Sequence, residues 1–221
     1  MLLPSERGEV VRLCKKMQDD GLTTGTSGNI SVRDAESGLV AISPSGVPYE
    51  DLEERDVVIV SRAGDVVEGR RVPSSELEMH RCVYEGRPAA GCVVHTHSPY
   101  ATMLACLEHD LPPIYPNLAC ASAGTGEGGV RCMPFMHSHT AEFGRAVADA
   151  LGDDFALLLG HHGVLTCGPD AGYAYMVAVT VEFCARLYVG GGALGEPRAL
   201  GADELADCVS RFRRARSKAL G

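Results

Sequence analysis

The stretch GCVVHTHSPY, residues 91–100, places two histidines one residue apart at the end of an apolar run. β-Branched residues such as Val93 and Val94 favour a buried strand. Because side chains alternate between the two faces of a strand, His95 and His97 are expected to point the same way. Two imidazoles side by side can bind a metal ion, although a strand end with ordinary hydrogen bonds gives the same short pattern.

Two other features could complete a metal site. The stretch LLLGHHGVL, residues 157–165, interrupts an otherwise apolar strand with His161 and His162, and a buried polar side chain needs a partner. Glu76 stands at the front of a predicted helix, just before the His-x-His strand. Three neutral imidazoles suit Zn²⁺, whose catalytic sites keep one exchangeable position, and a carboxylate that leaves that position can act as a base. The alternative assigns separate structural roles to these groups and needs three coincidences.

Three loops rich in small hydrogen-bond donors indicate an anion site: TGTSGN, SPSG and PSSE. Glycines let backbone amides approach an anion closely, and serines at a helix N-terminus add the favourable end of the helix dipole. The candidate residues are Gly28, Asn29, Ser45, Gly46, Ser74 and Ser75. Ordinary turn and capping chemistry explains any single loop equally well. Neither a Walker loop nor a Gly-x-Gly-x-x-Gly fingerprint is present, so nucleotide binding is not implied.

The composition indicates one globular domain and limits its partners. The chain has 221 residues, of which 45% are apolar and 22% charged, enough to bury a core without disulfides or metal staples. The net charge of −9 disfavours nucleic acid or an anionic membrane as a partner, because both require clustered Lys and Arg. A local cationic pocket for a small phosphate is still compatible with that charge.

The cysteines and the apolar stretches predict a cytoplasmic protein. The nine cysteines form no Cys-x-x-Cys motif, are odd in number and lie mostly in apolar runs, which is typical of reduced, buried cysteines. The N-terminus turns polar after three residues, unlike a signal peptide. The longest apolar stretch, residues 176–189, contains Glu182 and Arg186 and is too interrupted to span a bilayer.

The hydrophobic patterns predict helices and strands that interleave without strict alternation. The predicted helices cover residues 5–20, 73–87, 99–109, 140–152, 169–189 and 202–220. The predicted strands lie within residues 39–43, 56–61, 91–97, 130–135 and 155–168, and a further short strand ends the loop segment 21–34; a hairpin is predicted around Gly64 and an irregular segment at 112–120. This order favours a layered α/β or α+β domain. We expect a single domain over residues 1–221, with the tail 190–221 packing as a helix or an interface segment.

Four stretches, taken in this order, resemble the class II aldolase and adducin-head family. They read TSGNISVR, SPSGVPYEDL, PSSELEMHRCVYEGRPAAGCVVHTH and LLLGHHGVLTCG, and the resemblance covers about residues 10–190. It implies an α/β fold, a three-layer α/β/α sandwich around a mostly antiparallel mixed sheet. It also implies a homotetramer with active sites at the subunit interfaces.

The resemblance also assigns roles to single residues. By match to the family motifs, His95, His97 and His162 would bind one Zn²⁺ per subunit. His162 is chosen over His161 because the family's ligand immediately precedes a glycine, here Gly163. Glu76 matches the catalytic acid/base. The family's phosphate-binding positions match Gly28, Asn29, Ser45, Gly46, Ser74 and Ser75.

Other residues receive weaker assignments from the same resemblance. His80 corresponds to a family histidine outside the metal site, and His109, His137 and His139 are expected on the surface or in loops. Tyr115 lies near the position of a proton-donating tyrosine that an adjacent subunit supplies, but Pro116 is the alternative in that register. The glycine-rich loop 121–129 is a possible substitute.

The activity implied by the resemblance is reversible cleavage of a ketose 1-phosphate, such as L-fuculose 1-phosphate, to dihydroxyacetone phosphate and a small aldehyde such as lactaldehyde. Glutamate at the end of PSSE favours the aldolase branch, because the epimerase branch resembles PSSD. The alternatives are 4-epimerisation of a pentulose 5-phosphate and decarboxylation of a phosphorylated 3-oxo acid. Outside enzymes, the adducin head is a scaffold that lacks the metal residues, and a structural zinc site would be closed by four ligands.

Overall fold

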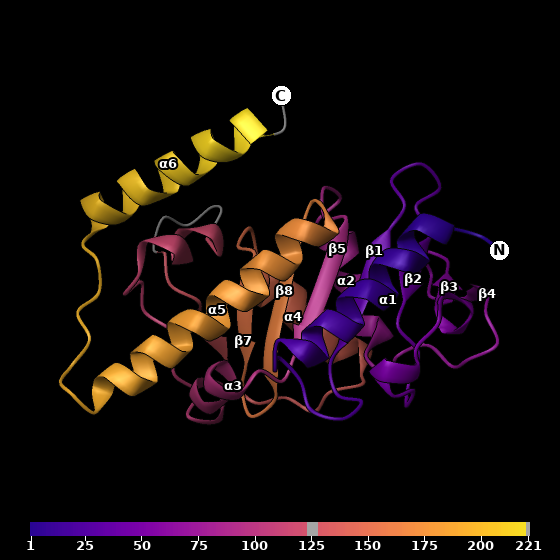
Figure 1. Ribbon diagram of the computed structural model, residues 1–221, viewed down its shortest axis with the longest axis horizontal. Helices are drawn as coiled ribbons and strands as arrows, with labels where there is room; N and C mark the ends of the chain where they lie inside the picture. The colour runs from indigo at the N-terminus through magenta and orange to yellow at the C-terminus, as the bar shows by residue number, and fades with distance from the viewer. Residues whose placement is uncertain (123–127, 220–221) are drawn as a thin grey trace.

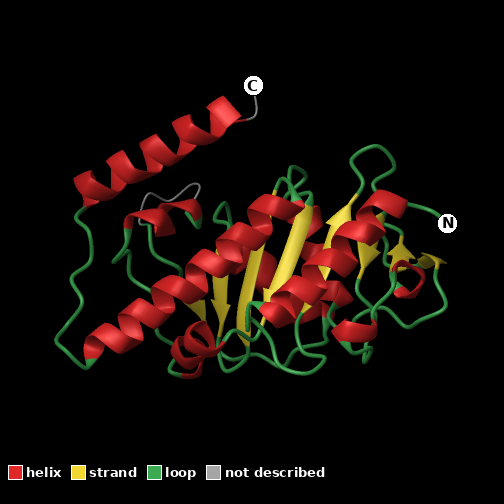
Figure 2. Cartoon of the chain, viewed as in Figure 1, coloured by secondary structure: helices red, strands yellow, loops and turns green. Residues whose placement is uncertain are grey.

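One mixed sheet runs through the molecule in the order β4-β3-β2-β1-β5-β8-β7-β6 (Figures 1 and 2). The structure is a computed structural model that describes residues 1–122 and 128–219. Every neighbouring pair of strands is antiparallel except β6 and β7. The strands are β1 (Asn29–Arg33), β2 (Val40–Ile42), β3 (Val58–Val60), β4 (Val66–Glu68), β5 (Cys92–Thr96), β6 (Cys132–Met133), β7 (Ala156–Leu159) and β8 (Gly163–Gly168).

Helices cover both faces of this sheet. On one face lie α1 (Pro4–Asp19), α3 (Pro99–Cys106) and α5 (Ala171–Gly192), and on the other lie α2 (Leu77–Gly86) and α4 (Ala141–Leu151) (Figure 1). Short 3-10 helices occur at η1 (Tyr49–Asp51), η2 (Glu54–Asp56) and η3 (Pro116–Cys120). The predicted three-layer α/β/α sandwich around a mostly antiparallel mixed sheet is therefore confirmed.

The central strand β5 divides its side chains between the two helical layers. Cys92 and Val94 pack with α1 and α5, whereas Val93 packs with α2 and α4. The period of two along a strand then places His95 on the same face as Val93. The imidazole of His95 therefore faces the side of the sheet where α2 begins.

Two predicted elements differ from the observed ones. The apolar run 155–168 was predicted as one strand, but it forms two antiparallel strands, β7 and β8, because Gly160, His161 and His162 make a tight turn between them. His162 consequently lies in a turn and is not an interruption within a strand. The helix predicted from residue 73 begins at Leu77, because the hydroxyl of Ser74 accepts a hydrogen bond from the backbone N–H of Glu76 and holds residues 73–76 in a loop.

The tail forms the helix α6 (Ala202–Ala219), which lies apart from the sandwich and packs against η3 (Figure 1). Leu205 is its buried anchor, with 2% of its surface exposed. Among the described residues, no helix combines the length and apolar character needed to cross a membrane.

Candidate metal centre and active site

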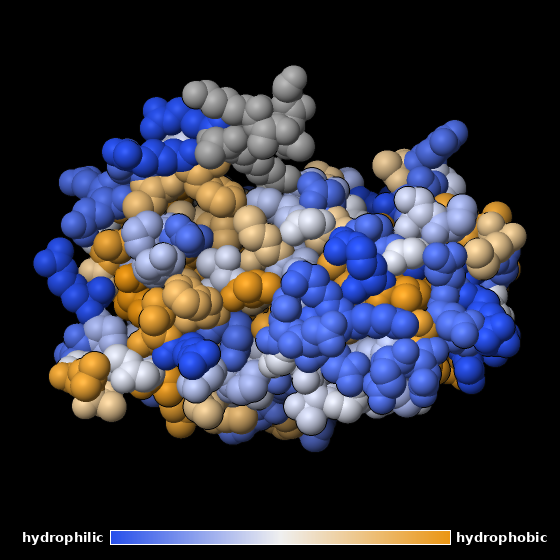
Figure 3. All heavy atoms as spheres, viewed as in Figure 1, coloured by the Kyte–Doolittle hydropathy of each residue, from blue (hydrophilic) through white to orange (hydrophobic). Residues whose placement is uncertain are grey.

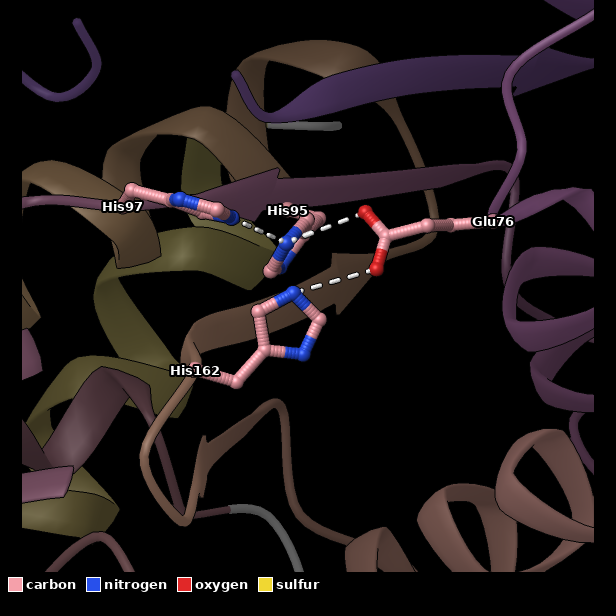
Figure 4. Close-up of side chains that lie close together, drawn as sticks. All are labelled: Glu76, His95, His97 and His162. Carbon is pink, nitrogen blue, oxygen red and sulfur yellow. Dashed lines mark hydrogen bonds and ion pairs between the residues drawn. The ribbon is translucent and has the colours of Figure 1, made fainter. Parts of the chain in front are cut away.

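Four side chains converge at the end of β5 (Figure 4). Glu76 is the N-cap residue of α2, His95 belongs to β5, His97 follows that strand directly, and His162 comes from the β7–β8 turn. The Nε2 atom of His95 lies 3.0 Å from Nε2 of His97 and 3.2 Å from Oε2 of Glu76. Nε2 of His162 lies 3.1 Å from Oε1 of Glu76. The ligand atoms of all four residues lie within 4.8 Å of one another.

The protonation states of the imidazoles suit a metal ligand. Nδ1–H of His95 donates to the backbone carbonyl of Val164 at 2.9 Å, which leaves the lone pair on Nε2, the atom that faces the cluster. Burial lowers the pKa of His95 to about 3 and also lowers the pKa of His97, so both rings are neutral near pH 7. A neutral imidazole is the form that binds a metal ion.

The carboxylate of Glu76 is buried but ionised. Burial alone would raise the pKa of Glu76, but its interactions with His95, His162 and Asn29 outweigh that effect and hold the pKa below its usual range. The amide of Asn29 donates to Oε2 at 2.8 Å, whereas Oε1 has no hydrogen-bond partner. A buried carboxylate oxygen without a hydrogen bond is a costly arrangement that a cation would relieve.

The spacing of the donor atoms also fits a tetrahedral ion. Bonds of 2.0–2.1 Å from a tetrahedral zinc ion place two ligand atoms about 3.3–3.4 Å apart. The separations of 3.0, 3.1 and 3.2 Å in the cluster are close to that value. Three imidazoles and one carboxylate are therefore a donor set that could hold a zinc-type cation.

Gly163 allows the two histidines of β5 to pack against the start of β8. A β-carbon at Gly163 would lie 2.4 Å from the carbonyl oxygen of Thr96, 3.2 Å from Cδ2 of His97 and 3.4 Å from Cε1 of His95. Gly28 plays a similar part on the other side, where a β-carbon would lie 2.7 Å from the carbonyl oxygen of His95. Both glycines are therefore needed for close backbone approach around the cluster.

We predict that Gly163→Ala weakens both the fold and metal binding. The new methyl group must push β8 away from β5, which should cost about 1–3 kcal/mol of unfolding free energy and displace both rings. Urea unfolding and zinc titration of the variant measure these effects. Gly190→Ala in α5 is the matched control, because its β-carbon meets no atom within 4 Å. Equal stability and zinc affinity of the two variants would contradict the prediction.

The predicted anion-binding residues lie in loops around Glu76. Gly28 and Gly46 have φ of +75° and +70°, a conformation that favours glycine. The backbone N–H groups of Ser45 and Ser74 donate to the carbonyls of Val72 and Ser43, so these amides are already paired. Their hydroxyl groups, and the exposed residue Ser75 beside Glu76, are the donors that these loops offer. Asn29 differs from the others because its amide contacts Glu76 directly.

The remaining candidates lie elsewhere. The side chain of His161 is 52% exposed and lies 3.9 Å from Glu108, so it points away from its neighbour His162. His109, His137 and His139 are exposed, as expected. The ring of Tyr115 packs against Phe183 of α5, with the centroids 5.6 Å apart. Residues 123–127 of the glycine-rich loop fall outside the described residues.

Sequence patterns did not reveal that His80 and Ser31 form a buried group behind Asn29. Nε2 of His80 lies 2.5 Å from Oδ1 of Asn29, and Nδ1 of His80 lies 2.7 Å from the hydroxyl of Ser31. The signal was present, because His80 follows Glu76 by four residues on one helix face and Ser31 follows Asn29 by two on one strand face.

Comparison with known proteins gives a consistent result. The family model described as "Class II Aldolase and Adducin N-terminal domain" matches residues 8–189. A 5-deoxy-D-ribulose 1-phosphate aldolase of Bacillus thuringiensis serovar kurstaki is 42% identical over 96% of this chain and 97% of its own length. An L-fuculose phosphate aldolase of Escherichia coli K12 is 35% identical over 93% of both chains. A solved L-fuculose 1-phosphate aldolase is 35% identical, with a TM-score of 0.89 over 95% of this chain and 96% of that one.

The family model covers the whole sandwich, and the matched residues include all four members of the converging cluster. The chain belongs to the class II aldolase and adducin N-terminal domain family.

Proposed function

We propose that this protein is a zinc-dependent aldolase that reversibly cleaves a ketose 1-phosphate to dihydroxyacetone phosphate and a small aldehyde. The convergence of three imidazole Nε2 atoms and the ionised carboxylate of Glu76 carries this proposal. A non-catalytic, adducin-like scaffold would not explain this donor set, because buried polar groups without a ligand destabilise a fold.

The chain's own groups account for the proton movements of the cleavage. A zinc-type cation held by His95, His97 and His162 would supply Lewis-acid stabilisation of the negative charge that develops on the substrate oxygens. As the C3–C4 bond breaks, the C4 hydroxyl loses its proton and the electron pair stays on the C3 side. The ionised carboxylate of Glu76 takes up this proton and then delivers it to C3, so that it ends the cleavage ionised again; in the synthetic direction it removes the proton from C3 and returns it to the C4 oxygen. Its oxygen Oε1, which makes no hydrogen bond and lies 3.1 Å from Nε2 of His162, is the oxygen that we assign to this transfer.

The names of two similar relatives support a sugar with a terminal methyl group as the substrate. The two substrates in the relatives' names, 5-deoxy-D-ribulose 1-phosphate and L-fuculose 1-phosphate, are both ketose 1-phosphates that end in a deoxy carbon. Their cleavage releases acetaldehyde and lactaldehyde, respectively, besides dihydroxyacetone phosphate. We propose 5-deoxy-D-ribulose 1-phosphate as the first substrate to test and L-fuculose 1-phosphate as the second.

A panel of these two ketose 1-phosphates, two pentulose 5-phosphates and one phosphorylated 3-oxo acid, with zinc-loaded protein, tests the proposal. Release of free aldehyde and dihydroxyacetone phosphate supports the aldolase. An epimer as the main product would replace it with the 4-epimerase, and release of CO₂ from a phosphorylated 3-oxo acid would replace it with the decarboxylase. Zinc binding without turnover of any of these would overturn the enzyme proposal.

We predict that Ser75→Ala weakens the binding of phosphorylated substrates. The exposed hydroxyl of Ser75 is a free donor next to Glu76, and a hydrogen bond to a charged group contributes about 1.5–3 kcal/mol. KM should therefore rise about tenfold or more for the ketose 1-phosphate but little for the unphosphorylated ketose. Steady-state kinetics with both sugars decides, and equal changes in KM would remove Ser75 from the phosphate site.

We also propose that the protein assembles as a homotetramer with active sites at the subunit interfaces. An apolar stripe on α5, which lies on the near face of the molecule in Figure 3, supports this assembly. It consists of Met176, Val179, Phe183 and Leu187, which are 37%, 38%, 47% and 40% exposed. Tyr115 contacts this stripe through Phe183, so the assembly would present Tyr115 to the neighbouring subunit.

Phe183→Glu is expected to dissociate the tetramer, because it places a charge in the middle of the apolar stripe. Light scattering of the purified variant measures its mass. Val66→Glu, on the edge strand β4 and 50% exposed, is the matched control. If Phe183→Glu is still a tetramer, the subunit interface does not include the apolar stripe. Tyr115 would then not be presented to the active site of a neighbouring subunit.

A further inference from the structure

A chain of hydrogen bonds connects α2 and β1 behind the carboxylate of Glu76. The amide nitrogen of Asn29 lies 2.8 Å from Oε2 of Glu76, and its Oδ1 lies 2.5 Å from Nε2 of His80. On the other side of that ring, Nδ1 lies 2.7 Å from the hydroxyl of Ser31. The hydroxyl of Tyr84 lies 2.9 Å from Oγ of Ser31 and donates to the Ser31 carbonyl at 3.0 Å.

Polar side chains of α2 and β1 lie opposite one another because they repeat at nearly the same spacing along the helix and along the strand. Glu76, His80 and Tyr84 recur every four residues at the start of α2 and along it, a spacing of about 6 Å. Asn29 and Ser31 recur every two residues along β1, a spacing of about 6.6–6.8 Å. Each polar group on the helix therefore contacts one on the strand, and the contact nearest the candidate site is that between Asn29 and Glu76. We call this set of hydrogen-bonded side chains the ladder; it consists of Glu76, His80 and Tyr84 with Asn29 and Ser31.

The hydrogen bonds of this ladder can run in only one direction. If Nε2–H of His80 donates to Oδ1 of Asn29, the amide of Asn29 turns its NH₂ toward the carboxylate of Glu76, and Nδ1 accepts from Ser31. The opposite tautomer would need the flipped amide, which would place Oδ1 of Asn29 against the ionised carboxylate. Two acceptors at 2.8 Å repel each other, so only the first arrangement pairs every group.

The surroundings of His80 support the neutral ring that this arrangement needs. The side chain is fully buried, and burial lowers the pKa of His80 to about 4. A neutral imidazole has one donor and one acceptor nitrogen, as the ladder requires. The ring can also not turn to another partner, because it lies between Asn29 and Ser31, which are themselves 5% and 0% exposed.

We infer that His80 is a positioning residue for the proposed aldolase reaction, because it locks the Asn29 amide and thereby holds the Glu76 carboxylate in the orientation that transfers the proton. The inference rests on the proposed function of Glu76. With His80 in place, Asn29 fixes Oε2 of Glu76 and leaves Oε1 without a hydrogen bond. Without it, Oδ1 of Asn29 loses its buried donor, and the amide is no longer held in the position from which its NH₂ contacts Oε2 of Glu76.

His80→Leu and His80→Gln test this inference as a pair in the full-length, zinc-loaded protein. Leucine fills space but cannot donate, so kcat should fall by about 10- to 100-fold, while KM for the ketose 1-phosphate stays near its original value. Glutamine carries an amide donor near the position of Nε2 and should restore most of kcat. Tyr84→Phe is the matched control, because it removes a hydroxyl from the same buried ladder but leaves the bond between His80 and Asn29 intact.

A second measurement does not depend on turnover. In protein labelled with ¹⁵N-histidine, NMR should show His80 as the neutral tautomer with its proton on Nε2, and the resonance should exchange slowly with water because the ring is buried. The same tautomer is expected in Tyr84→Phe. A proton on Nδ1 instead would mean that the Asn29 amide has the opposite orientation, which overturns the inference.

The kinetic outcomes separate this inference from the proposed function. If the unmodified protein turns over none of the substrates in the panel, the proposed function itself is refuted. Normal kcat in folded His80→Leu, or a rise in KM alone, refutes the positioning role, and the rise in KM would assign His80 to phosphate binding through Asn29. If Tyr84→Phe and His80→Leu lost kcat equally, general destabilisation of the fold would explain both losses. That result would also refute the positioning role of His80.

Discussion

His95→Ala is expected to abolish aldol cleavage and to lower the affinity for Zn²⁺. His95 has no exposed surface, and its Nε2 lies within 3.2 Å of both His97 and Glu76, so it occupies the centre of the cluster. Lewis-acid stabilisation contributes several kcal/mol to such a reaction, and its loss corresponds to a decrease in kcat on the order of 10³-fold or more. Zinc content by atomic emission and kcat on the panel substrates measure the two effects.

His161→Ala is the control for this variant. It removes an adjacent imidazole of the same turn that supplies His162, but its own ring is half exposed and points away from the cluster. Zinc content and kcat should both be preserved. Removing zinc with a chelator should reproduce the loss seen in His95→Ala, and adding zinc back should reverse it. Turnover by the metal-free protein at the full rate would refute the Lewis-acid role.

Glu76→Gln is expected to keep the metal and lose proton transfer. Its amide has nearly the shape of the carboxylate, so its oxygen can still accept from Asn29, and the three histidines keep their positions. It cannot, however, remove or deliver a proton, and general acid–base catalysis contributes about 10²- to 10⁴-fold. Deuterium exchange at C3 of dihydroxyacetone phosphate, followed by proton NMR, measures this step without the aldehyde.

Comparing zinc content with deuterium exchange distinguishes a loss of proton transfer in Glu76→Gln from a loss of the metal. Zinc content should remain close to that of the original protein, whereas deuterium exchange should fall by the factor just given. Glu78→Gln is the control, because Glu78 is also an acidic residue at the start of α2 but pairs with Arg81 on the surface. Unchanged exchange in Glu76→Gln would assign the proton transfer to another group.

Local patterns in the sequence predicted most of the helices and strands and pointed to Glu76, His95 and His97, whereas His162 was chosen over His161 from the family resemblance. Alternation along the strand put His95 and His97 on one face, and an apolar run with two histidines marked the segment that supplies His162. The three layers followed from the family resemblance, since the interleaved order of helices and strands left α/β and α+β both open.

Long-range pairing could not be predicted from the same patterns. The turn at His161 was hidden because both flanking strands are buried on two faces and read as one continuous apolar run. His80 was placed outside the metal site by the family resemblance, and its partners could not be predicted because nothing local says which strand faces α2. Only the pairing of Asn29 opposite His95 in the sheet brings β1 under that helix and gives the buried imidazole its partner.

The order of the strands also has a consequence for biogenesis. The imidazole of His162 comes from the turn before β8, and β8 is made long after β5, beside which it must insert. While β8 of a nascent chain is still inside the ribosomal exit tunnel, the imidazole of His162 cannot join Glu76, His95 and His97, so the set of donor atoms is incomplete. The complete set of four donors can therefore form only after the second half of the chain has been made, and a chain truncated before β7 would lack the imidazole of His162.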